Sequence, residues 1–160
     1  MGCKALIRMR RFINILIFVL LPIIIGELIY IISRSKSLKM FKWFEQINLS
    51  KEVELLRNQF SNFELPNWII YNLPDFLWVF SFTSLILIIW NMKINKENIF
   101  YIIFPMAIGI FSELGQLFST VNGTFDKMDL IFYLCGGLTS IFIITKIKTY
   151  INEKNITPLY

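Results

Sequence analysis

Four long apolar segments constrain this chain more than any other feature. They cover residues 12–32, 74–90, 99–118 and 130–147 of a 160-residue sequence. An α-helix rises about 1.5 Å per residue, so about 17 to 25 residues match the roughly 30 Å hydrocarbon core of a bilayer. A helix also satisfies its own backbone hydrogen bonds inside lipid. The sequence therefore predicts an all-α, polytopic membrane protein whose single membrane domain covers residues 1–160.

The composition agrees with this prediction and removes several kinds of chemistry. Hydrophobic residues make up 56% of the chain and charged residues only 17%, against about 45–50% and about 25% in soluble domains. Histidine is absent, which excludes Ser-His and Cys-His catalysis and histidine-ligated metals. Two cysteines exclude a disulfide scaffold.

The stretch between the first two apolar runs differs in kind. Residues 33–67 carry six basic and four acidic side chains, with apolar residues returning every three or four positions. This spacing is typical of an amphipathic helix. The segment is too charged to span a bilayer, so we expect it to lie at the membrane interface, outside the cytoplasm.

The basic residues predict the orientation. A cluster of four precedes the first apolar run, and cytoplasmic segments of membrane proteins carry an excess of Lys and Arg. With both termini cytoplasmic, the inner segments carry nine basic residues and the outer segments seven. The formal charge of +5 lies beside apolar runs and does not form a stripe interleaved with aromatics. We therefore expect a lipid bilayer as the partner and no nucleic acid.

Under this topology, the polar residues of the spans fall on one side of the membrane. A carboxylate at the bilayer centre costs about 2.5–3.5 kcal/mol, so repeated carboxylates in one leaflet are expected to face the interior of the bundle. We expect them to form an outward-facing polar pocket, closed toward the cytoplasm by Leu, Ile and Phe. Its predicted members are Glu27, Asp75, Glu113, Gln116, Asp126, Asp129 and Tyr133.

Two stripes at helical spacing sharpen this prediction. One, in the third apolar run, consists of Gly109, Glu113, Gln116 and Thr120, and the other, in the fourth, consists of Asp129, Tyr133, Gly136 and Ser140. Small residues let membrane helices approach closely. We expect the two stripes to face each other.

Several of these residues also have simpler interpretations. Asp75 follows Pro74 and could complement a helix N-terminus, and Asp126 could be an N-cap. Glu27 could lie against a lysine stem or be protonated. Glu113 and Gln116 are harder to explain structurally, because the C-terminal half of a helix disfavours an anion.

At this point the residues match a known pattern. Ser-Glu-Leu-Gly-Gln-Leu-Phe at 112–118, Gly-Thr-Phe-Asp at 123–126, Asp129-Leu130, Tyr133 and Gly136-Gly137 together resemble the VanZ-like family of small bacterial membrane proteins. Leu-Pro-Asp-Phe-Leu-Trp at 73–78 is similar to an element of further relatives. The resemblance covers residues 73–140. The chain departs from the pattern at Asn122-Gly123, where many members carry an Arg.

The resemblance implies a bacterial cell-membrane location and a link to glycopeptide-antibiotic resistance. It also implies that the functional positions are Glu113, Gln116, Asp126 and Asp129.

Three functions then compete. The leading hypothesis is a VanZ-like protein whose acidic pocket binds an envelope component, a lipid or cell-wall headgroup, with no cofactor and no assigned catalytic or metal-binding residue. The first alternative is a magnesium-dependent membrane enzyme acting on an isoprenoid or phospholipid headgroup, with Mg²⁺ held by oxygen ligands from Glu113, Asp126 and Asp129. The second alternative, a transporter or channel subunit, is weakened by the apolar inner halves of the spans.

Overall fold

The computed structural model describes residues 2–156, and describes side chains for residues 8–149. The described residues contain helices and no β-strand, which confirms the all-α prediction. Lys4 and Lys154, which contributed to the predicted orientation, have side chains outside the described residues. The elements in chain order are α1 (Gly2–Ile15), η1 (Leu16–Leu20), α2 (Leu21–Ser33), α3 (Lys39–Gln46), α4 (Ser50–Gln59), α5 (Asn67–Tyr71), α6 (Leu73–Ile89), α7 (Ile99–Leu117) and α8 (Lys127–Ile156).

Three of the described helical segments are long and apolar enough to cross a membrane: Arg8–Ser33, Ile99–Leu117 and Lys127–Thr149. Helix α6 is equally apolar but has only 17 residues. Large apolar side chains on all of these helices point outward, including Ile24, Phe111 and Phe142. An outer surface of this kind suits lipid better than water. The structure therefore indicates a membrane protein.

The first apolar run is one continuous helix that widens in its middle. Over η1 the helix adopts a π turn, in which the Leu21 N–H donates to the Leu16 carbonyl five residues earlier. Pro22 follows this turn, has no N–H, and would clash with the carbonyl four residues before it in a regular α-helix. The wider turn therefore lets the helix pass through the proline without ending.

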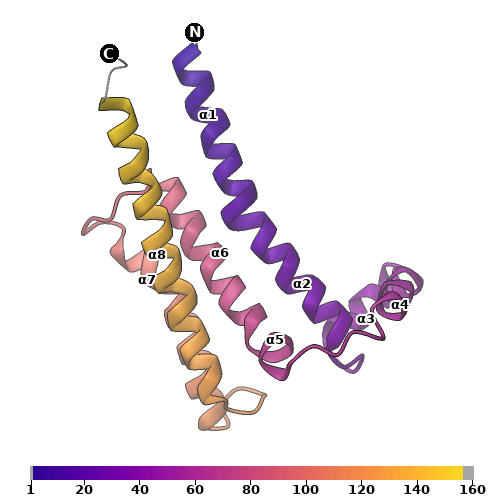
Figure 1. Cartoon of the computed structure of the whole chain (residues 1–160). Helices are drawn as coiled ribbons and strands as arrows, with labels where there is room; N and C mark the ends of the chain where they lie inside the picture. Colours follow the sequence, from indigo (N-terminus) through magenta and orange to yellow (C-terminus); the bar gives the residue numbers. More distant parts are fainter. Residues whose placement is uncertain (1, 157–160) are drawn as a thin grey trace.

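Helix α6 is the centre of the bundle (Figure 1). It packs against α8 most extensively, and also against α2 and α7. A Cβ atom added to Gly136 of α8 would lie 2.5 Å from the Phe76 carbonyl oxygen of α6. The buried Ser84 and Ser140 hydroxyls form a 2.9 Å hydrogen bond across the same interface. Small residues thus bring these two helices into backbone contact, as is common in membrane proteins.

Two apolar clusters fill the interior between α6, α7 and α8. One is formed by Val79, Met106 and Tyr133, and the other by Leu87, Ile102 and Ile144. Ser81 and Thr83 of α6, whose side chains carry hydroxyl groups, are also fully buried. The interior between these three helices is therefore filled mainly by apolar side chains, with a few hydroxyls along the middle of α6.

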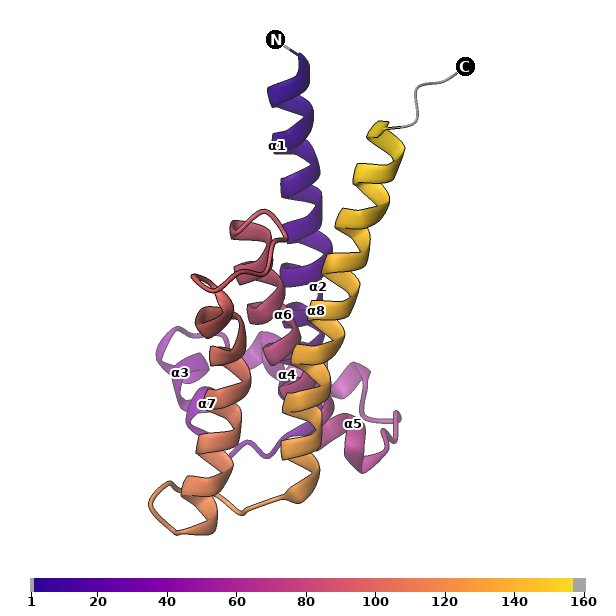
Figure 2. The same cartoon turned by 90° about the vertical axis from the view of Figure 1, so that its left-hand side faces the viewer.

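The start of α1 and the end of α8 lie at the same end of the molecule, and the segment of residues 33–67 lies beside the opposite end of α2 (Figures 1 and 2). This segment is two short helices, α3 and α4, followed by an extended stretch leading to α5. The Arg57 guanidinium of α4 donates to the Ile31 and Arg34 carbonyls. Because the last carbonyls of a helix lack partners within it, these bonds attach α4 to the end of α2.

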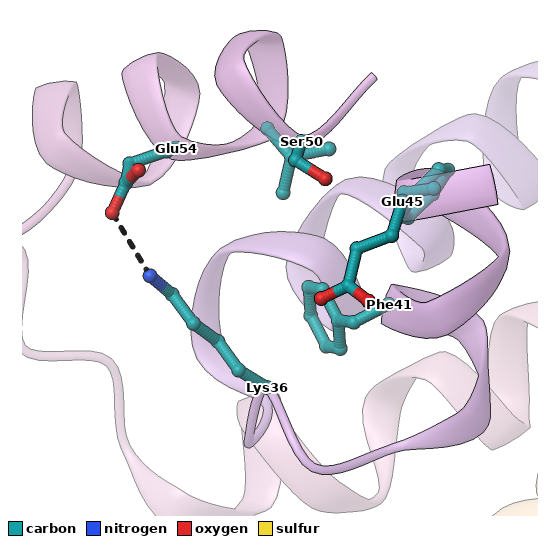
Figure 3. Close-up of a pocket in the computed structure, with 7 residues that line it drawn as sticks. Lys36, Phe41, Glu45, Ser50 and Glu54 are labelled. Carbon is teal, nitrogen blue, oxygen red and sulfur yellow. Dashed lines mark hydrogen bonds and ion pairs between the residues drawn. The ribbon is translucent and has the colours of Figure 1, made fainter. Parts of the chain in front are cut away.

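Helices α3 and α4 enclose a small cavity of about 190 Å³ (Figure 3). Phe41, Phe44 and Val53 line its apolar side. An exposed ion pair of 3.1 Å between Lys36 Nζ and Glu54 Oε1 joins the linker before α3 to α4. Exposed ion pairs contribute little stability, so the aromatic side chains contribute most of the packing here.

Candidate functional site

The predicted polar residues, with one exception, gather at one end of the bundle. Helix α6 begins there, α7 ends there and α8 begins there (Figures 1 and 2). We call this the acidic end and define it by the residues Asp75, Glu113, Gln116, Asp126, Asp129 and Tyr133. The ends of these helices place the six residues near one another, although they come from three separate parts of the sequence.

Glu113 lies at the centre of the acidic end and is only 2% exposed. Its Oε1 accepts a hydrogen bond of 3.2 Å from Gln116 Nε2, one turn further along α7. Its Oε2 accepts a hydrogen bond of 3.0 Å from the backbone N–H of Asp126, in the loop before α8. Because buried carboxylates need donors, these two bonds explain how the side chain is accommodated. The second bond also attaches the α7–α8 loop to the end of α7.

Asp126 acts as the N-cap of α8. It directly precedes the helix, and its Oδ1 accepts a hydrogen bond of 2.8 Å from the Met128 N–H. This is the geometry in which a capping side chain satisfies an unpaired N–H of the first turn. Of the two interpretations open at this position, the structural one is therefore confirmed.

Asp129 has a partner that the sequence analysis missed. Its Oδ1 accepts a hydrogen bond of 2.6 Å from Asn72 Nδ2. Asn72 directly precedes α6 and is 5% exposed. A polar residue immediately before the Leu-Pro-Asp helix start was the available signal, because Asn is a preferred N-cap type. The bond connects the first turn of α8 to the start of α6.

Asp75 and Tyr133 form a second connection between α6 and α8. The Tyr133 hydroxyl lies close enough to the Asp75 carboxyl to interact with it. The Tyr133 ring covers Gly109 of α7, where an added Cβ atom would lie 2.6 Å from the ring. Gly109 and Tyr133 are members of the two predicted stripes, so the stripes do meet at this level.

The stripes do not face each other along their whole length. The nearest neighbour of Gly136 is Phe76 of α6, and Ser140 forms a hydrogen bond with Ser84 of α6. Thr120 lies outside the helix, where its hydroxyl donates to the Gly115 carbonyl. Helix α8 packs more extensively against α6 than against α7, so part of its predicted stripe meets α6.

Glu27 is the exception, because the structure does not bring it to the acidic end. Its side chain is exposed on α2. Helix α2 turns Pro22 and Gly26 toward α6, and a Cβ atom on Gly26 would lie 3.7 Å from Pro74 and Leu77. Successive helical residues are about 100° apart. The residue after Gly26 is therefore directed away from α6.

A cation that the sequence analysis placed in the amphipathic segment lies close to the acidic end. The Arg34 guanidinium lies between the Tyr30 and Tyr71 rings, 4.9 and 4.8 Å from their centroids. It is near enough to Asp75 and Asp129 to interact with both charges. Its Nε is buried without a hydrogen-bond partner among the described residues. Tyr30 one turn before Arg34 was the available sequence signal.

The loop before α8 is shaped by Gly123. Its φ of +146° is a conformation that residues with a side chain rarely adopt, and an added Cβ atom would meet the Gln116 side chain at 2.6 Å. The Asn-Gly turn, which stands where the resemblance expects an Arg, therefore lets the loop pass directly over Gln116.

The described residues contain no group of three or more His, Cys, Asp or Glu side chains arranged to hold a metal ion. Comparison with protein-family models, curated proteins and solved structures finds no significant match for this chain. The candidate site is a set of carboxyl groups that accept hydrogen bonds from Gln116, the Asp126 backbone and Asn72, with Arg34 beside it.

Proposed function

We propose that this chain is a VanZ-like, multi-pass bacterial cell-membrane protein with four spans and cytoplasmic termini. Helix α6, the second of the four in chain order, is the span that the three longer helices leave to be added. Its 17 residues extend about 26 Å, and α5 directly precedes it. An even number of spans is supported by the start of α1 and the end of α8, which lie at the same end of the bundle (Figure 1). The α3–α4 segment then lies at the outer interface.

We further propose that the acidic end faces outward and binds an envelope component, a lipid or cell-wall headgroup. The observation that carries this proposal is the nearly complete burial of Glu113 at the meeting point of α7 and the α7–α8 loop. An acid this deeply placed in a membrane helix is costly to insert. The presence of a buried acid at this position is explained if Glu113 and the carboxyl groups around it bind a ligand.

Arg34 narrows the kind of headgroup. A ligand at the acidic end meets carboxyl groups on α6 and α8 and a guanidinium held by two tyrosines. Arginine is well suited to carboxylate and phosphate groups. A headgroup that carries a positive and a negative charge fits this arrangement better than a simple cation. The proposed role of this site is binding of the headgroup, with no chemical step assigned to its residues.

The test uses a susceptible bacterial host that expresses the protein. We expect the wild-type chain to lower susceptibility to a glycopeptide antibiotic, and Glu113→Ala and Asp129→Ala to abolish that effect. Glu97→Ala is the matched control, because Glu97 is an exposed acid in the α6–α7 loop at the other end of the bundle. Unchanged susceptibility for Glu113→Ala and Asp129→Ala, at expression equal to wild type, would refute the proposed role of the acidic end.

A further inference from the structure

A larger cavity, of about 420 Å³, lies where the end of α2 meets α4, α5 and the stretch between them. Ile32 and Ser33 of α2 line one side of it, and the span that includes α2 ends at Ser33. The cavity therefore lies at the depth where hydrocarbon gives way to lipid headgroups. Its volume falls within the range of ligand pockets, about 300–1,000 Å³.

Arg57 is the cation of this cavity, and its position is fixed. Its Nη1 donates to the Ile31 and Arg34 carbonyls, the latter at 3.0 Å, and its guanidinium lies 5.3 Å from the centroid of the Phe41 ring. Its Nε and Nη2 groups have no acceptor among the described residues. A guanidinium with N–H groups still available, held in one orientation, is suited to a phosphate group.

The cavity also contains a carboxylate and an apolar wall. Glu64 lines it from the stretch before α5, and its side chain is exposed. Among the described side chains the ion pair is Lys36–Glu54, so Arg57 and Glu64 share the cavity without pairing. Phe63 and Ile70 contribute apolar surface, and Phe63 is 72% exposed. A positive group, a negative group and an apolar surface therefore lie together at the level of the headgroups.

We propose that this cavity holds one zwitterionic phospholipid whose headgroup carries a primary ammonium. The phosphate lies on Arg57, the ammonium lies on Glu64, and an acyl chain follows the apolar wall. Phosphatidylglycerol has no ammonium, so its phosphate would lie near the Glu64 carboxylate without a compensating positive charge, which is repulsive. A choline headgroup has the charge but no N–H to donate. This site uses none of the residues of the acidic end, so it does not depend on the function proposed there.

The test is lipid retention by the full-length protein. The purified chain is exposed in detergent to equal amounts of phosphatidylethanolamine, phosphatidylcholine and phosphatidylglycerol, and bound lipid is identified by native mass spectrometry. We expect wild type to retain phosphatidylethanolamine most and phosphatidylglycerol least. Because a hydrogen bond to a charged group contributes about 1.5–3 kcal/mol, Arg57→Gln should reduce retention of all three about tenfold or more. Glu64→Gln should keep lipid binding and lose the preference over phosphatidylglycerol.

Matched controls separate lipid binding from folding. Lys51→Gln and Glu52→Gln change exposed charges on α4 outside the cavity and should retain lipid as wild type does. Ile70→Trp fills the cavity while leaving Arg57 in place, and should lose lipid with unchanged helical circular dichroism. Equal retention of phosphatidylglycerol by wild type, or wild-type retention by Ile70→Trp, would overturn the proposal. If Arg57→Gln does not fold, Ile70→Trp and Glu64→Gln still decide it.

Discussion

Each end of the bundle contains a polar side chain that is almost fully buried, Glu113 at one end and Asn98 at the other, and the two are satisfied in different ways. At the acidic end, Glu113 is 2% exposed and accepts bonds from Gln116 and from the backbone of Asp126, 13 residues away. At the opposite end, Asn98 is fully buried in the α6–α7 loop. Its amide donates to the Lys93 carbonyl and its Oδ1 accepts from the Asn95 N–H.

The difference lies in how far along the chain each partner is. An asparagine carries both donors and an acceptor, so Asn98 can close a loop within five residues. An ionised glutamate only accepts, so Glu113 requires donors that the bundle brings to it. The end with Asn98 is therefore a locally determined turn. The acidic end exists only when the helices that meet there are packed, which is what makes it a candidate binding site.

The largest expected contrast between the ends is in access from outside the cell. In a background without native cysteines (Cys3→Ser, Cys135→Ser), Thr124→Cys at the acidic end should be labelled by an impermeant maleimide on intact cells. Asn95→Cys at the other end should be labelled only after the membrane is opened, because the proposed topology places it inside. Labelling of Asn95→Cys in intact cells would reverse the orientation of the whole bundle.

The next effect concerns the helix contact that supports the acidic end. Gly136→Val places a side chain where the Phe76 carbonyl oxygen already lies, 2.5 Å from an added Cβ atom. Overpacking of this kind costs typically 1–3 kcal/mol, and backbone contact favours the upper part of that range, about 3 kcal/mol. Denaturant unfolding in detergent micelles measures it. Gly26→Ala is the control, because its Cβ atom would meet α6 at an ordinary 3.7 Å and should change stability little.

The smallest expected effect compares the two buried polar residues directly. Glu113→Ala leaves the Asp126 N–H and the Gln116 amide without an acceptor and should reduce the free energy of unfolding by about 2 kcal/mol. Asn98→Ala frees the Lys93 carbonyl and the Asn95 N–H, which belong to exposed residues that water can reach, and should cost about 1 kcal/mol. The same unfolding measurement in micelles checks both. A larger loss for Asn98→Ala than for Glu113→Ala would mean that the local turn, and not the helix junction, is the more important contact.

Much of the fold was predictable from hydrophobicity alone. The predicted run 99–118 matches α7 within one residue at its end, and 74–90 matches α6 within one residue at each end. Helix α8 extends beyond its apolar run at both ends, because Asp126 caps it early and charged residues continue it. Helical periodicity predicted a helical segment at residues 33–67. The structure has two short helices there, followed by a non-helical stretch that leads to α5.

The candidate site was predictable in its carboxylates but not in their partners. Burial cost marks an acid in an apolar run, which is why Asp75 and Glu113 were found; Asp129 was found because it directly precedes the fourth run. Asn72 and Arg34 lie outside the apolar runs and carry no such mark. Glu27 carries the mark but lies on the exposed side of α2, since Gly26 and Pro22 face α6.

The amino-acid sequence alone determined that the helices are long, apolar and separated by polar loops. The reason is that the free-energy cost of placing a charge in lipid depends on each residue and its near neighbours. Packing decided the rest. Which side chains meet depends on how each helix is rotated about its axis, and that rotation is set by contacts such as Gly136 with Phe76 and Gly109 with Tyr133. Such contacts join residues far apart in the sequence, so only the folded bundle brings Asn72 to Asp129 and the Asp126 N–H to Glu113.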